Sequence, residues 1–165
     1  MAKPFKKKDI IGVQGVYKTR QASLVARFTQ LEIEDRYDRM KGFSSIDFIG
    51  TYSAGYRRNV FVRAGMFDEA FPIPSGEDSD LSFRASKVGK MVFNSRAVVY
   101  HEHPSSLVEY LKVKFWRAYW RILLYRKHKG KMVNYSYTPQ GLKLQIGLFY
   151  LLLVSLVLSL FLDLL

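Results

Sequence analysis

The last part of the chain carries no charged residue between Leu144 and Leu162. Apolar side chains fill most of this run, and a membrane-spanning helix needs roughly 20 of them in a row. Lys143 and Asp163 bracket the run. A buried core helix is the alternative, but such a helix usually carries a polar stripe, and this run has none. We therefore expect a transmembrane helix at 142–165.

The segment at 105–141 is strongly basic and rich in aromatic residues. Its long helical pattern predicts an amphipathic interfacial helix with a linker, lying against a membrane. Because basic residues favour the cytoplasmic side, we expect a cell-membrane protein whose globular part is cytoplasmic. Arg117 and Arg121 recur at helical spacing and are candidates to bind a diphosphate. A stripe of cations that faces lipid headgroups is the simpler interpretation of the same residues.

The overall charge is strongly positive, since 26 Lys and Arg oppose 14 Asp and Glu for a formal net charge of +12. Such a charge indicates an anionic partner, which can be phospholipid, a phosphorylated substrate or nucleic acid. Nucleic-acid binding would require aromatic stacking positions on a sheet. Here aromatic and basic residues gather beside the uncharged run instead, so we expect no nucleic acid. The absence of cysteine excludes disulfides and thiolate metal sites.

The remaining pattern predicts an α/β fold. The expected strands are 10–17, 46–49 and 91–100, and the expected helices are 19–40, 57–64, 78–88 and 107–127. Two prolines make 71–76 a loop.

A carboxylate cluster, residues 76–80, stands at the start of one predicted helix. The spacing of Ser75 and Asp78 is that of a capping box, and acidic residues are favoured at a helix N-terminus in any case. On a helical projection Asp80 falls on the polar side, where it can pair with Arg84 one turn later. Asp78 falls on the apolar side and is the carboxylate expected to face a cleft.

Two histidines follow the strand expected at 91–100, where ligands gather in open α/β sheets. His101 and His103 lie on the same face of an extended chain, with Glu102 on the other. Such a pair can bind a metal, although no third ligand is close in sequence. A hydrogen-bonded structural role is the alternative.

Four blocks of residues, taken in series, resemble the second half of family 2 glycosyltransferases, which have the GT-A fold. The blocks are 50–58, 64–69, 76–84 and 98–104, and the similarity covers roughly 10–130. The resemblance implies that Asp78 is the general base that deprotonates the acceptor hydroxyl. It implies that His101 binds a divalent metal, Mg or Mn, or the donor diphosphate.

The same resemblance implies that the glycine-rich loop lines the sugar pocket, with Ser53 and Arg58 as substrate contacts. Glu77, Arg117 and Arg121 complete the substrate-binding residues expected from the block order and the basic helix. Ser53 stands near the position where the family often has Asn.

The family's nucleotide-binding strands and metal-binding Asp-x-Asp motif are not found in this sequence. We therefore expect 1–104 to be the acceptor-side half of a GT-A domain, inactive without a partner chain that carries the other half. The expected reaction moves a sugar from a nucleotide-sugar donor to a polysaccharide or glycolipid acceptor. A non-catalytic membrane-anchored subunit or remnant that supports another glycosyltransferase chain is the alternative.

Overall fold

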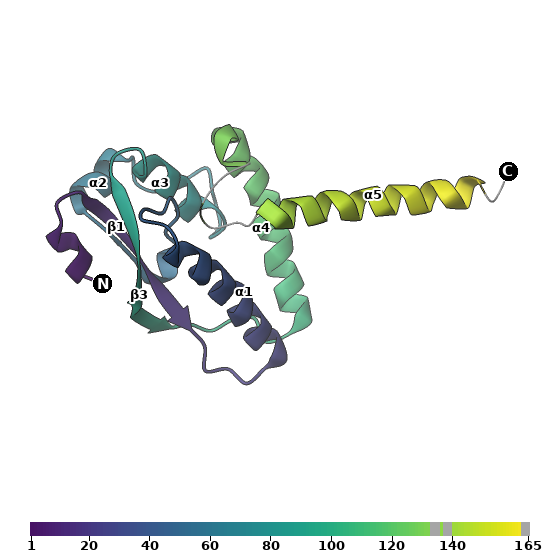
Figure 1. Cartoon of the computed structure of the whole chain (residues 1–165), viewed down its shortest axis with the longest axis horizontal. Coiled ribbons are helices and arrows are strands. Elements are labelled where there is room, and N and C mark those ends of the chain that lie inside the picture. Colours follow the sequence, from purple (N-terminus) through teal and green to yellow (C-terminus); the bar gives the residue numbers. More distant parts are fainter. Residues whose placement is uncertain (133–135, 137–139, 163–165) are drawn as a thin grey trace.

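Three strands form one mixed sheet, in the order β2-β1-β3, in the computed structural model of the chain (Figure 1). The structure describes residues 1–132, 136 and 140–162. The strands are β1 (Ile10–Lys18), β2 (Ala54–Tyr56) and β3 (Lys90–Tyr100), and the helices are α1 (Leu24–Lys41), α2 (Arg58–Arg63), α3 (Glu77–Ala85), α4 (Leu107–Lys127) and α5 (Gln140–Leu162). Short 3₁₀ turns form at η1 (Lys3–Lys6), η2 (Thr51–Ser53) and η3 (Lys129–Met132). The chain is therefore an α/β protein with a small sheet.

Strand β1 is the centre of the sheet, parallel to β3 and antiparallel to β2. All its residues except the last are buried, as expected of a strand covered on both faces. The parallel pairing is interrupted between Gln14 and Val16, where the register shifts. Parallel pairing brings the carboxyl ends of β1 and β3 to the same edge of the sheet, with His101 following directly on β3.

Helix α1 packs one face into the core and begins later than expected. Ser23 caps the helix by accepting a hydrogen bond from the Ala26 amide at 3.3 Å, so residues 19–22 stay outside it. Ile33 and Tyr37 lie one turn apart on the buried side, and Met40 continues it. This face joins the core cluster that also contains Phe83 of α3 and Met91 of β3.

The strand predicted at 46–49 is wrong. Ile46 makes only an isolated bridge to Met91, while β2 at 54–56 is the strand that pairs with β1. The reason lies in a side chain, because the backbone of Ile49 bonds at both its amide (2.9 Å) and its carbonyl (3.1 Å) with the Ser82 hydroxyl. A hydroxyl from α3 thus takes the place of a neighbouring strand.

The capping box predicted at Ser75 and Asp78 is also wrong. The residue before α3 is Gly76, at φ +109°, and it provides no side-chain cap. The Ser75 hydroxyl instead lies 3.5 Å from the Trp116 carbonyl of α4. A capping box does form at α4, between Ser106 and Glu109.

Gly15 allows β1 to approach its neighbours closely. A Cβ at this position would lie 2.6 Å from the Ala97 carbonyl oxygen, a backbone atom of β3 that cannot move without disturbing the sheet. We expect Gly15→Ala to lower the free energy of unfolding by about 1–3 kcal/mol. Urea unfolding followed by circular dichroism measures the loss. Gly130→Ala is the control, since nothing lies within 4 Å of its Cβ position, and equal stabilities for the two variants would contradict the prediction.

Helix α5 projects away from the sheet and the helices around it (Figure 1). Within the described residues, no helix has the length and apolar character that crossing a bilayer requires. The transmembrane helix predicted at 142–165 is therefore wrong, and residues 163–165 of that prediction lie outside the described part of the chain.

Candidate functional site

Asp78 lies in the first turn of α3, directly after the left-handed Gly76. One of its carboxylate oxygens accepts hydrogen bonds from the Ser79 amide at 2.7 Å and from the Ser79 hydroxyl at 3.3 Å. The free amides at a helix N-terminus favour negative charge there. Helix α3 therefore holds this carboxylate in a fixed place at its own positive end.

Burial is the largest influence on Asp78, and it raises the pKa of this carboxyl group to about 6. The neighbouring carboxylate of Glu77 raises the pKa further, while the hydrogen bonds from Ser79 and the charge of Arg117 lower it. Such a group is mostly ionised at neutral pH and can still take up a proton. This is the property that general-base chemistry requires.

Arg117 of α4 acts electrostatically on two separate parts of the fold. Its charge lowers the pKa of Asp78 and also that of His103, where burial is the larger cause and His101 contributes as well. Arg117 is therefore within electrostatic range of both Asp78 and His103. That Asp78, His101 and Arg117 form one site stays a prediction.

The two histidines share one face, as expected, with ring centroids 5.5 Å apart. Tyr17 lies against both, at 5.1 Å from His101 and 5.2 Å from His103. His103 is buried, and its Nε2 lies 3.0 Å from the Gln30 side-chain oxygen. His101 is exposed, so it is the histidine available to a ligand.

The described residues do not by themselves fit a divalent metal site. No group of three or more His, Asp or Glu side chains in this part of the chain could hold an ion. The ring neighbours of His101 are Tyr17 and His103, whereas Mg²⁺ and Mn²⁺ prefer oxygen ligands. Metal binding at His101 stays a prediction.

Other predicted contacts lie in different places. Ser53 is buried beneath the sheet, with its hydroxyl 3.5 Å from the Ala97 carbonyl, so it acts there as a packing residue. Arg58 is exposed at the start of α2. Arg121 lies one turn beyond Arg117 on α4, and Glu77 lies beside Asp78.

Asp80 is not on a solvent-exposed polar face, because only 2% of it is exposed. The expected pair with Arg84 does form, at 2.6 Å. The other carboxylate oxygen lies 2.7 Å from Nε2 of His128, at the end of α4. Asp80 therefore joins α3 to the end of α4 and is a structural residue.

Sequence reasoning missed Tyr17 and Gln30 as neighbours of the two histidines. Gln30 could have been recognised from the sequence, because a polar residue on the buried face of α1 needs a buried hydrogen-bond partner. Among the described residues, the buried side-chain atoms without a hydrogen-bond partner include Glu77 Oε2 and Trp120 Nε1.

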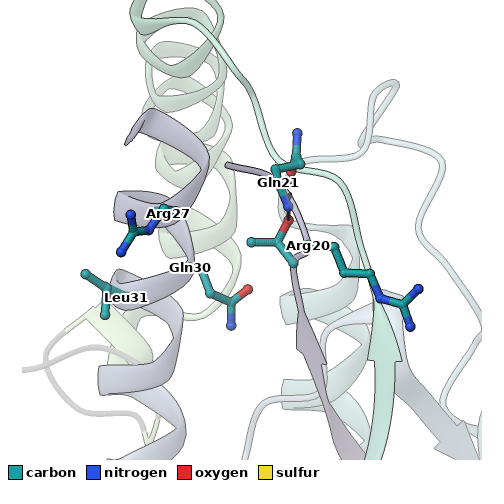
Figure 2. A pocket seen from close by; sticks show the side chains of 6 residues that line it. Arg20, Gln21, Arg27, Gln30 and Leu31 are labelled. Carbon is teal, nitrogen blue, oxygen red and sulfur yellow. Dashed lines mark hydrogen bonds between the residues drawn. The ribbon is translucent and has the colours of Figure 1, made fainter. Parts of the chain in front are cut away.

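Two cavities lie near these elements. One, of about 330 Å³, is a groove between 73–75 and α4, and Arg117 is among its lining residues. The other, of about 300 Å³, lies between the end of β1 and α1 (Figure 2). The side chains of Arg20 and Arg27 diverge in the second cavity, so they do not form a joint anion site (Figure 2).

No protein-family model matches this chain, and no curated protein matches its sequence at a significant level.

Proposed function

We propose that the chain forms the acceptor side of a glycosyltransferase that uses a nucleotide-sugar donor, with Asp78 as the general base. The observation that carries this proposal is the Asp78 carboxyl group, held at the start of α3 with a pKa of about 6. The resemblance of the four sequence blocks to family 2 glycosyltransferases supports the same assignment. The acceptor is a polysaccharide or glycolipid.

The chemistry needs one proton acceptor. The acceptor hydroxyl oxygen attacks the anomeric carbon of the donor sugar, its proton passes to Asp78, and the bond from that carbon to the diphosphate breaks. The nucleoside diphosphate leaves with the bonding electron pair. Since the pKa of Asp78 is about 6, the carboxylate is ready to accept the proton at neutral pH. The cation of Arg117 favours both the carboxylate and the diphosphate that forms.

The sheet supports the idea of a half domain. Sheets commonly have about 4–6 strands, whereas this one has three within the described residues. On β3, Val98, Val99 and Tyr100 are 44%, 38% and 59% exposed. We propose that a partner chain with nucleotide-binding strands covers this sheet and brings the donor, at the cytoplasmic face of the cell membrane.

The alternative is a non-catalytic subunit that supports another glycosyltransferase. Transfer and hydrolysis of nucleotide-sugars, measured with this chain alone and with the polypeptide encoded next to it, separates the two. Activity that needs both chains and disappears in Asp78→Asn supports the enzyme. Full activity of the complex with Asp78→Asn supports the subunit.

A further inference from the structure

The groove between 73–75 and α4 combines cations with an apolar wall. Ile73, Pro74, Val113 and Trp116 form the apolar part, and Lys112 and Arg117 provide the charges. No ion pair joins either cation to a carboxylate within the described residues, whereas Lys114 is bound to Glu32 at 2.8 Å. The groove is therefore suited to a ligand that is anionic at one end and apolar at the other.

An exposed apolar stripe continues from the groove along the outer face of α4. Its members repeat at helical spacing, and each is more than half exposed. They are Leu107, Leu111, Phe115, Tyr119 and Ile122, exposed by 61%, 55%, 63%, 53% and 61%. The only acidic residue of α4 is Glu109, which is used in the capping box. Lys112 flanks the stripe on one side and Arg121 on the other.

We propose that the groove binds the phosphorylated headgroup of a lipid, and that the stripe of α4 lies on the lipid surface that presents this headgroup. Amphipathic helices with Lys and Arg beside Trp, Phe and Leu bind anionic lipid surfaces in this way. This binding is independent of catalysis. Naming the lipid as the sugar acceptor rests on the function proposed above.

Charge distinguishes a lipid from the other possible occupants. A second copy of the chain would bring one formal charge of +12 against another, which opposes association through this basic helix. A polysaccharide would leave the side chains of Leu111 and Phe115 exposed to water. An anionic lipid surface neutralises the cations and covers the stripe at the same time.

Tryptophan fluorescence tests this site directly, because both tryptophans of the chain, Trp116 and Trp120, lie on α4. In a Trp120→Phe background, Trp116 is the only probe. The full chain is mixed with phosphatidylcholine vesicles, with or without phosphatidylglycerol, and with acyl chains brominated near the headgroup. We expect a blue shift and quenching with phosphatidylglycerol, both weaker at high salt. Inorganic phosphate alone should produce neither.

Two pairs of variants make the test specific. Lys112→Gln should weaken binding to the anionic vesicles about fivefold, and Phe115→Ser should remove most of the quenching. Lys87→Gln and Phe43→Ser are the controls, since both residues are exposed away from α4 and Phe43 is 52% exposed. Circular dichroism confirms that each variant is folded.

Three results would overturn the proposal. One is unchanged Trp116 emission while the chain sediments with vesicles, because α5 then binds lipid and α4 does not. Another is an equal effect of Lys112→Gln and Lys87→Gln. The third is a full shift with inorganic phosphate. The two proposals can fail separately. If the complex transfers no sugar with either the wild type or Asp78→Asn, and both still bind lipid, the enzyme proposal is wrong and the lipid site stands.

Discussion

Replacing Asp78 by Asn should lower sugar transfer by about 10²–10⁴-fold and, at the same time, make the protein more stable at neutral pH. The first effect follows from losing the general base, which contributes by this order in enzymes. The second follows from burial, which raises the pKa of the carboxyl group from its usual 3.8 to about 6. Residues that reduce the stability of the folded protein are expected at functional sites.

The pH dependence of this second effect has a definite sign. The folded state binds the Asp78 proton more tightly than the unfolded state does, so the protonated carboxyl contributes stability that is present at low pH. That contribution is lost as the pH rises from 3.8 through about 6. The stability of Asp78→Asn should match the wild type near pH 4 and exceed it by about 1–3 kcal/mol at pH 7.5.

Urea unfolding at the two pH values measures the difference, and the transfer assay with the partner chain measures the activity. Asp38→Asn is the matched control, because the Asp38 side chain is 71% exposed and paired with Lys41 on α1. It should change neither quantity appreciably. If Asp78→Asn is less stable than the wild type at pH 7.5, the Asp78 carboxylate stabilises the fold and the prediction is wrong.

Several helices and strands could be predicted because the residues that determine them are close together in sequence. The long helix at 107–127 has the bounds of α4, where Ser106 and Glu109 cap the start. The strand expected at 91–100 forms as β3, one residue longer. The helical projection identified Arg84 as the partner of Asp80, which the structure confirms. Its placement of Asp80 on the exposed polar side is wrong, because Asp80 is buried.

What could not be predicted depends on partners far away in sequence. Nothing near Ile49 reveals that a Ser82 hydroxyl, 33 residues later, satisfies its backbone. The burial of Asp80 follows from His128, which lies 48 residues away. The transmembrane prediction used the polarity of residues 142–165 alone. It is wrong because no helix within the described residues is long and apolar enough to cross a bilayer.

Asp80 is the residue whose removal should reduce stability the most. Its carboxylate is 2% exposed and accepts hydrogen bonds from Arg84 at 2.9 and 2.6 Å, while its other oxygen lies 2.7 Å from His128. Arg84 in turn donates to the carbonyls of Ala64 and Met66. Breaking a buried charge pair leaves the partner charge uncompensated, so we expect Asp80→Ala to lose about 3–5 kcal/mol.

The control for this prediction is Asp35→Ala. Asp35 also pairs with an arginine one turn away, Arg39, but its side chain is 63% exposed. An exposed ion pair contributes only about 0–1 kcal/mol, so thermal or urea unfolding should show a large loss for one variant and almost none for the other. In a double-mutant cycle, Asp80→Ala and His128→Ala should be coupled by about 0.5–3 kcal/mol. Additive effects would mean that Asp80 does not hold the end of α4.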